Sequence, residues 1–266
     1  MSVVHHNGSQ TATAADRPSR DGALVQWLGS VLFTAFLFVS TLVYAVVVLA
    51  SGVLPHPQRY AVARHWARTQ LSMLKLLCRL DYVVEGAEHL PAGNHISMWK
   101  HASAWETICQ ILVFPPQSWV LKREIMWIPV VGWATKLLKP IAIDRKARSS
   151  AVNQVVKQGQ QRLAEGLWIL IFPEGTRMPV GQTRRYGVSG ALLASRTGRQ
   201  IVPVAHNAGY FWPRRGLLKR PGTIRVVIGC PVECAGRDPR EINAQVQAWI
   251  EAEVARIAPG QVQGSG

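Results

Sequence analysis

The sequence predicts an α/β fold, a layered sheet flanked by helices and preceded by an N-terminal membrane helix or helical hairpin. Three observations favour it. A long uncharged apolar segment stands near the N-terminus, short apolar segments alternate with helical ones beyond residue 80, and 48% of the residues are hydrophobic against 17% charged. A chain of 266 residues suits one hydrophobic core plus an anchor rather than a multidomain assembly.

The charge balance indicates an anionic partner. The chain has 30 Lys and Arg against 15 Asp and Glu, a formal net charge of +15. Nucleic acid, an anionic membrane surface and phosphorylated substrates all suit such a chain, and composition does not choose among them. Composition does exclude a disordered chain and an acidic cytosolic enzyme.

The cysteines favour a reducing compartment and give no metal site. Cys78, Cys109, Cys230 and Cys234 are too few and too scattered for a disulfide framework in a chain of this length. No second Cys or His pair follows Cys230 and Cys234 at the spacing of a zinc site. We therefore expect no metal and no resident cofactor.

Residues 1–22 are small and polar, and we expect a disordered leader there. No Asp, Glu, Lys or Arg occurs between Gly22 and Gln58, and residues 24–50 are almost all apolar. A helix of that length would measure about 40 Å against a hydrocarbon core of about 30 Å, so it can span a bilayer with tilt. A cleavable signal peptide is the alternative. Because the apolar segment is longer than a signal core and its leader is not strongly basic, we predict a retained anchor.

Basic residues follow the apolar segment, from Arg59 to Arg79, whereas Arg17 and Arg20 before it are offset by acidic neighbours. This asymmetry predicts a protein of the cell inner membrane with the bulk of the chain, residues 81–258, facing the cytoplasm. Residues 59–80 alternate basic and apolar positions at helical spacing, which fits a surface-lying amphipathic helix and a core-facing helix equally well. A hairpin over residues 24–80 that enters one leaflet is a further interpretation. Residues 23–80 are thus assigned to the anchor and amphipathic helix, 81–258 to the catalytic domain and 259–266 to a flexible tail.

The catalytic domain alternates strands with helices, the pattern of a largely buried sheet. We predict strands over residues 82–85, 96–99, 119–121, 141–143, 167–172, 201–205 and 223–228. We predict helices over residues 105–112, 131–138, 151–165, 188–196 and 240–257. The chain has no Gly-x-Ser-x-Gly, Walker or Gly-x-Gly-x-x-Gly motif. Their absence argues against a serine hydrolase, a P-loop NTPase and a dinucleotide-binding enzyme.

The first candidate site pairs His101 with Glu106, between a predicted strand and a predicted helix. On one straight helix the two side chains would point to different faces, so they meet only if His101 lies on the turn before the helix. There the carboxylate can accept the imidazole N–H and fix its tautomer, which leaves the other ring nitrogen free to act as a general base. The alternative interpretation is a surface histidine with an unrelated glutamate five residues later.

The second candidate site is residues 172–177, Phe-Pro-Glu-Gly-Thr-Arg, at the end of a strongly apolar strand. Gly175 permits a tight turn, Thr176 and Arg177 offer a hydroxyl and a guanidinium, and Glu174 is expected to orient Arg177 toward a phosphate. A polar turn with a surface ion pair is the alternative.

Basic residues also follow other predicted strands: Lys122 and Arg123 after one, and Arg145 after another. The ends of parallel strands meet at one edge of an α/β sheet, so these residues predict a phosphate pocket there.

A basic loop carries Trp212, Arg214, Arg215, Lys219, Arg220 and Arg225. It fits a membrane surface better than nucleic acid, since the chain already has a predicted anchor.

In this order, the His101 and Glu106 pair, the Lys122 to Arg145 region, the segment 172–177 and the strand 201–205 resemble the four motifs of the glycerolipid acyltransferase family, and in particular its 1-acyl-sn-glycerol-3-phosphate (lysophosphatidic acid) acyltransferases. The resemblance covers roughly residues 60–257. The family more often has Asp where this chain has Glu106, which we interpret as a functional variant.

The resemblance implies a function. An acyl group would pass from acyl-CoA or acyl carrier protein to the sn-2 hydroxyl of lysophosphatidic acid, with membrane lipids as surroundings and no nucleic acid as partner. His101 would be the base and Glu106 its orienting carboxylate. The phosphate would be held by Lys122, Arg123, Arg145, Glu174, Gly175, Thr176 and Arg177. The acyl side of the site would include Ile201, Val202, Pro203 and Val204. The alternatives are an acyltransferase for another lysolipid, such as a lyso-ornithine lipid, and a non-catalytic module that binds anionic lipid.

Overall fold

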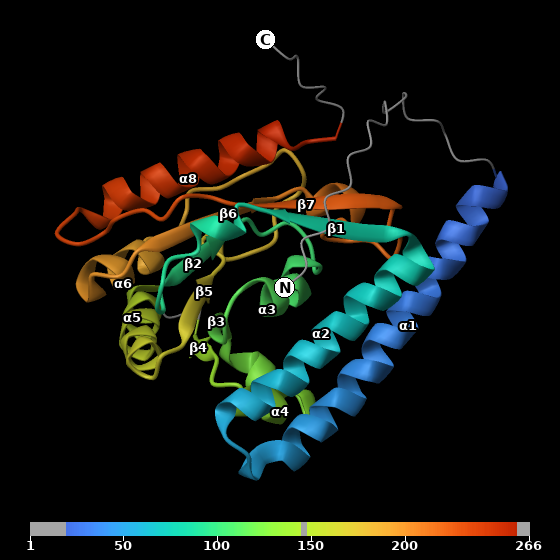
Figure 1. Ribbon diagram of the computed structural model, residues 1–266, viewed down its shortest axis with the longest axis horizontal. Helices are drawn as coiled ribbons and strands as arrows, with labels where there is room; N and C mark the ends of the chain where they lie inside the picture. The colour runs from blue at the N-terminus through green and yellow to red at the C-terminus, as the bar shows by residue number, and fades with distance from the viewer. Residues whose placement is uncertain (1–19, 145–147, 260–266) are drawn as a thin grey trace.

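The computed structural model describes residues 20–144 and 148–259, and over these residues seven strands form one sheet (Figure 1). Along the sheet their order is β1-β7-β6-β2-β5-β3-β4. All the predicted strands are present, with ends that differ by a few residues. The strands are β1 (Leu80–Glu85), β2 (Ile96–Trp99), β3 (Gln117–Lys122), β4 (Ile141–Ile143), β5 (Trp168–Ile171), β6 (Ile201–His206) and β7 (Gly222–Ile228).

Strand direction determines where the polar residues gather. β2 pairs in parallel with β5 and β6, and β3 pairs in parallel with β4 and β5. β7 runs antiparallel to β6, and β1 is parallel to β7. The carboxyl ends of β2 to β6 therefore lie at one edge of the sheet, the edge at which open α/β sheets bind ligands.

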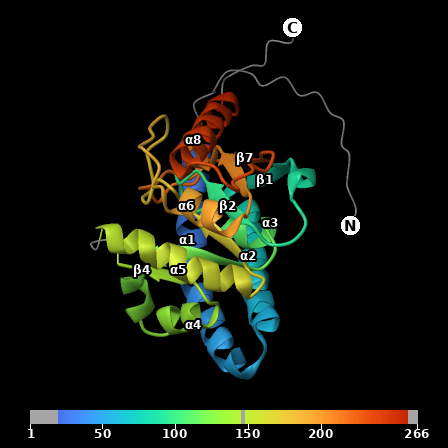
Figure 2. The same ribbon diagram turned by 90° about the vertical axis from the view of Figure 1, so that its left-hand side faces the viewer.

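Helices cover both faces of the sheet. α5 (Arg148–Ala164), α6 (Ser189–Thr197) and α8 (Pro239–Arg256) cover one face, and lie in front in Figure 2. α3 (Glu106–Val113) and α2 (His56–Cys78) cover the other. Buried side chains alternate along β2 accordingly, with Met98 in one core and Trp99 in the other. The predicted α/β layers are confirmed. The sequence did not predict the short helix α7 (Ala208–Phe211) or the 3-10 segments η1 (Ser51–Val53), η2 (Ala87–His89) and η3 (Arg123–Trp127).

The N-terminal helices form a hairpin. α1 (Arg20–Ala50) ends at η1, and Pro55 precedes α2, where proline stops one helix and starts the next. The buried side of α2, including Ala67, Leu71 and Leu74, packs into the core formed with α1, α3 and β1. Of the two interpretations of the amphipathic pattern, the structure therefore bears out the core-facing helix. The expected leader lies almost wholly outside the described residues.

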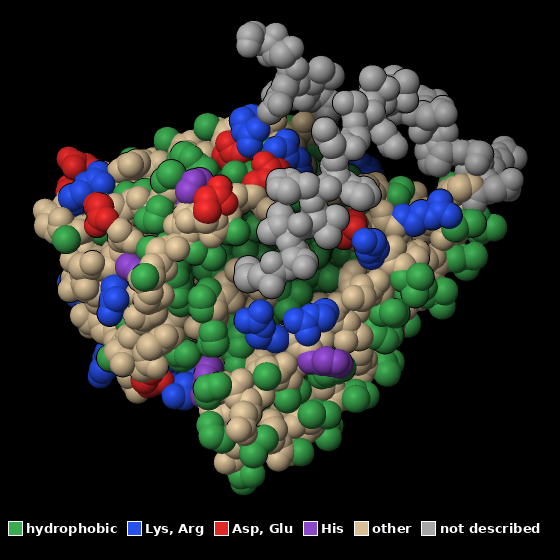
Figure 3. All heavy atoms as spheres, viewed as in Figure 1, with side chains coloured by type: hydrophobic (Ala, Val, Ile, Leu, Met, Phe, Trp, Pro, Cys, Tyr) green, Lys and Arg blue, Asp and Glu red, His purple; other side chains and the backbone are tan. Residues whose placement is uncertain are grey.

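The outward side of α1 is apolar. Exposed side chains include Leu24, Leu28, Leu32, Phe38 and Val46, and hydrophobic groups line the edge of the molecule formed by this helix (Figure 3). Among the described residues, one helical segment, Gly22–Val53, is long and apolar enough to cross a membrane. α4 (Val131–Leu137) contacts α1 and carries the half-exposed Trp133, which extends the apolar surface.

The basic loop after β6 is only partly the exposed surface that the sequence suggested, since Arg215 and Arg220 are exposed but two other members are not. Trp212 and Lys219 are buried, and the Lys219 ammonium lies 4.9 Å from the Trp212 ring and 5.4 Å from that of Phe33 on α1. The backbone N–H of Lys219 also donates to the Ser30 hydroxyl at 2.9 Å. The loop thus fastens α1 to the part of the chain that forms the sheet, because a buried ammonium needs such partners.

Candidate active site

His101 and Glu106 meet as the spacing predicts. His101 follows β2 on the turn into α3, and Glu106 is the first residue of α3. The His101 Nδ1 and Glu106 Oε1 atoms are 2.9 Å apart. The backbone N–H groups of Ala102 and Ser103 also donate to Oε1, at 3.0 and 2.9 Å. The carboxylate therefore holds both the imidazole and the turn that carries it.

Glu106 is completely buried. Burial alone would raise its pKa, but the hydrogen bond from His101, the nearby His206 and the backbone N–H of Ser103 outweigh it, and the pKa of Glu106 lies below its usual range. A carboxylate in this state accepts hydrogen bonds only, so His101 Nδ1 carries the proton and Nε2 is free to accept one. The arrangement is chemically that of a general base with an orienting carboxylate.

The segment 172–177 holds His101 from the other side. The ring of Phe172 stacks on the imidazole, with centroids 4.1 Å apart and planes inclined by 19°. Glu174 Oε2 accepts the His101 backbone N–H at 2.8 Å, and the Met178 N–H donates to the His101 carbonyl at 2.7 Å. Two sequence motifs thus form one site, since the second positions the histidine of the first.

Glu174 does not orient Arg177, which corrects the expected phosphate role of this glutamate. Its carboxylate is buried and pairs with Lys100 Nζ at 2.8 Å. Burial raises the pKa of Glu174, against the hydrogen bond and charge of Lys100. Lys100 itself is buried and also contacts Glu251 of α8 at 2.9 Å. Glu251 in turn accepts from Tyr186 at 2.7 Å. This ion cluster ties α8 to the turn beneath His101.

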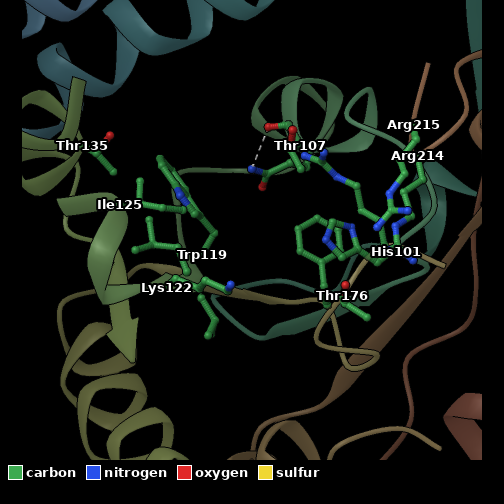
Figure 4. Close-up of a pocket in the computed structure, with 14 residues that line it drawn as sticks. His101, Thr107, Trp119, Lys122, Ile125, Thr135, Thr176, Arg214 and Arg215 are labelled. Carbon is green, nitrogen blue, oxygen red and sulfur yellow. Dashed lines mark hydrogen bonds between the residues drawn. The ribbon is translucent and has the colours of Figure 1, made fainter. Parts of the chain in front are cut away.

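An open pocket of about 530 Å³ lies against His101. Figure 4 shows His101, Thr176, Arg214 and Arg215 around one end, with Trp119, Ile125 and Thr135 at the other. Lys122 and Arg177 also line it, so Lys122 of the strand-end set shares one pocket lining with Thr176 and Arg177 of the segment 172–177. Among the described residues, neither Lys122 nor Arg177 is paired with a carboxylate.

Other predicted residues lie elsewhere. Arg123 lies outside this lining and pairs with Asp144 at 3.2 Å, with its guanidinium 5.8 Å from the Trp127 ring. Gly175 forms the turn, with φ of 67° and its N–H donating to the Phe172 carbonyl at 2.9 Å. Arg145 lies outside the described residues.

The predicted acyl-side strand does not reach the pocket. The side chains of Ile201, Val202 and Val204 are fully buried in β6, whose neighbours in the sheet are β2 and β7. Pro203 is buried in the same strand. A central strand covered by helices on both faces leaves no side chain for a ligand. These four residues are therefore core residues rather than part of the pocket lining.

An apolar pocket of about 210 Å³ adjoins the first one instead. The two share Thr107, Trp119 and Thr135. Its other walls come from α1, α2 and α4, including Ala45, Ala63 and Ala134. Small side chains here leave space between helices that would otherwise be filled. The polar pocket at His101 thus continues into an apolar one beside the hairpin.

Sequence reasoning missed several residues of the site. Lys100 and Glu251 are 151 positions apart, and no local pattern signals such a pair. His206 is fully buried, with Nε2 3.9 Å from Glu106 Oε2 and 2.8 Å from the Lys100 carbonyl. The basic character of Arg214 and Arg215 was evident, but their place beside His101 was not.

Comparisons with known proteins identify the family of the chain. The acyltransferase family model matches residues 81–207. A Pseudomonas aeruginosa protein named 1-acyl-sn-glycerol-3-phosphate acyltransferase is 41% identical over 242 residues, covering 89% of this chain and 94% of that protein. A Cocos nucifera protein of the same name is 26% identical, covering 90% of this chain and 82% of that protein.

The crystal structure of the 1-acyl-sn-glycerophosphate (LPA) acyltransferase from Thermotoga maritima has the same fold, with a TM-score of 0.73 at 22% identity, over 88% of this chain and 97% of that one. The high identity over nearly the whole length of the Pseudomonas relative decides the family. The chain belongs to the 1-acyl-sn-glycerol-3-phosphate acyltransferase family.

Proposed function

We propose that the protein transfers a fatty acyl group from acyl-CoA or acyl carrier protein to the sn-2 hydroxyl of lysophosphatidic acid, giving phosphatidic acid. The observation that carries this proposal is the His101–Glu106 pair, 2.9 Å apart, facing a pocket with two cations, Lys122 and Arg177, that have no carboxylate partner among the described residues. A phosphate monoester matches those cations.

The chemistry is a direct transfer. His101 Nε2 takes the proton of the sn-2 hydroxyl as its oxygen attacks the thioester carbonyl carbon. The tetrahedral intermediate collapses, the carbon–sulfur bond breaks, and the leaving thiolate takes the proton from Nε2. Glu106 keeps the imidazole in the required tautomer and stabilises its cationic form between the two steps. The proposal needs no metal and no resident cofactor, because the acyl donor is itself a substrate.

The acceptor is a membrane lipid, and the molecule offers it a route. Ile125 lines the catalytic pocket and is exposed, and Trp127 and Ile128 beside it are exposed as well. We propose that this apolar rim and the outward side of α1 contact the bilayer, so that the lysolipid enters laterally. Its phosphate would then lie at Lys122, Thr176 and Arg177. Association with the inner membrane from the cytoplasmic side fits this arrangement.

The test is transfer of a labelled acyl group from acyl-CoA to lysophosphatidic acid by detergent-purified protein. His101→Ala and Glu106→Gln are compared with His65→Ala, a change at an exposed histidine of α2 that lies outside the pocket. We expect kcat/KM to fall by about 10²–10⁴ for the first two variants, the usual contribution of a general base, and thermal melting checks that each variant is folded.

Two results would contradict the proposal. Full activity of a folded His101→Ala variant would remove the general base. Lysophosphatidic acid left unacylated by the wild type with both acyl-CoA and acyl carrier protein, while another lysolipid is acylated, would assign the site to that acceptor instead.

A further inference from the structure

A second open pocket, of about 450 Å³, lies beside the catalytic pocket. The two pockets share Arg214 and Arg215, whereas Arg220 lines only the second. Ala102, the residue after His101, lines the second pocket as well. The two pockets therefore adjoin at Arg214 and Arg215, next to His101.

Three arginines surround the second pocket without an acidic partner. Among the described residues, no hydrogen bond or ion pair involves the side chains of Arg214, Arg215 or Arg220. Other arginines are paired, as Arg225 is with Glu85 at 2.7 Å and Arg162 with Glu165 at 2.8 Å. Guanidinium groups gathered around a concave surface and left unpaired are suited to phosphate groups.

The backbone at one end of the arginine-bearing loop is held. The Arg220 N–H donates to the Phe211 carbonyl at 2.8 Å, and the N–H of the preceding residue, the buried Lys219, donates to Ser30 of α1 at 2.9 Å. Binding at Arg220 therefore mainly requires ordering its side chain, because the backbone there is already held.

The rest of the lining is uncharged. Pro179, Val180, Gly209 and Tyr210 lie with Ala102 in the wall of the pocket. Gly209 leaves little room, since a Cβ there would meet the Ala102 Cβ and Val180 Cγ2 atoms at 3.1 Å. The charged rim and neutral wall match a ligand with phosphate at one end and a slender neutral arm that reaches His101.

We propose that this pocket binds the phosphate-bearing pantetheine arm of the acyl thioester donor, so that donor and lysolipid reach His101 through separate openings. The inference rests on the proposed function, which supplies a thioester donor, but goes beyond it by assigning the donor its own site. The cations Lys122 and Arg177 serve the acceptor phosphate, and the three arginines of the second pocket serve the donor. Coenzyme A and acyl carrier protein share the phosphate next to pantetheine, so this chemistry suits either.

The test measures binding without turnover, which separates it from the acyl-transfer assay. Detergent-purified protein is titrated calorimetrically with four water-soluble probes: coenzyme A, dephospho-coenzyme A, 4′-phosphopantetheine and pantetheine. Arg220→Ala is compared with Arg196→Ala, a change at an exposed arginine of α6 that lines neither pocket. Lys122→Ala, which lines only the catalytic pocket, is the second comparison.

We expect Arg220→Ala to raise the Kd of coenzyme A about three- to tenfold, as for one partly screened charge-assisted contact, and the other two variants to leave it unchanged. A loss that persists with 4′-phosphopantetheine identifies the phosphate shared with acyl carrier protein. A loss seen with coenzyme A but not with dephospho-coenzyme A identifies the phosphate specific to coenzyme A. Either result supports the proposal.

Three results would overturn it. An unchanged Kd for coenzyme A in Arg220→Ala would remove the arginine from donor binding. An equal loss for pantetheine would show that phosphate is not recognised. A variant that binds coenzyme A normally but binds anionic phospholipid vesicles more weakly would assign the arginines to lipid headgroups. A failure of acyl transfer itself would leave these binding results readable, and would count against the proposed function alone.

Discussion

At the scale of single residues, the turn that carries His101 is held by groups that never touch the pocket. His206 is fully buried beneath it, and its Nε2 donates to the Lys100 carbonyl at 2.8 Å, while the Ala208 N–H donates to its Nδ1 at 3.3 Å. Both ring nitrogens are thus used in the neutral form. Burial lowers the pKa of His206, against the nearby charge of Glu106, with His101 and Lys100 as its other charged neighbours.

His206 therefore predicts a pH dependence of stability. Its folded pKa lies below the unfolded value of about 6.5, so its contribution is complete above that pH and is lost as the pH falls toward the folded value. Because the unfolded chain then binds the proton more tightly, the loss approaches about 1.4 kcal/mol per pH unit. We expect the melting temperature of the wild type to fall more between pH 7.5 and 5.5 than that of His206→Gln. An equal fall in melting temperature for the two proteins would mean that folding does not lower the pKa of His206.

Residue positions could be predicted where the contact is local. The His101–Glu106 contact follows from a five-residue spacing and a strand-to-helix turn, and the place of Lys122 and Arg177 in one pocket lining follows from strands that end at one edge. Glu174 was assigned wrongly because its partner, Lys100, lies 74 positions away. Nothing near either residue signals an ion pair buried under α8, so the sequence left Arg177 as the obvious partner.

At the scale of elements, the hairpin of α1 and α2 depends on close approach. A Cβ at Gly29 of α1 would lie 2.1 Å from the Leu77 carbonyl oxygen of α2. Polar contacts cross the same interface, such as Gln70 Nε2 to Ser40 Oγ at 2.7 Å. The amphipathic pattern of α2 predicted a helix but not what it packs against, because a membrane surface and a protein core select the same apolar stripe.

Replacing Gly29 tests this packing. We expect Gly29→Ala to cost about 1–3 kcal/mol of stability, because backbone atoms must move apart to admit the methyl group. Thermal unfolding in detergent measures the effect. Gly52→Ala is the matched control, since a Cβ there would meet only Leu137 Cδ1, at 3.5 Å. Equal melting temperatures for the two variants would show that the helices are not in close contact at Gly29.

At the scale of the whole molecule, charge and apolar surface restrict how the protein can meet a membrane. The apolar outer side of α1 continues into Trp127 and Trp133, which are 63% and 50% exposed. α2 packs along α1 and carries Arg64, Arg68 and Lys75. A hairpin that crossed the bilayer along α1 would take these cations into hydrocarbon, at a cost of several kcal/mol each. Insertion of one side into a single leaflet keeps them at the interface.

This arrangement predicts where the ends of α1 are accessible. Leu24 lies near the start of α1 and Val53 lies in η1, just beyond its end, and both are exposed. Cys230 is an exposed free thiol that serves as a reference. In sealed membrane vesicles, we expect a membrane-impermeant maleimide added on the side opposite Cys230 to label neither Leu24→Cys nor Val53→Cys, because insertion into one leaflet exposes neither end of α1 on that side. Because the buried thiols of Cys78, Cys109 and Cys234 are shielded, they add little background. Labelling of Leu24→Cys only from the opposite side would show instead that α1 crosses the bilayer. The cations of α2 would then not lie at the membrane surface.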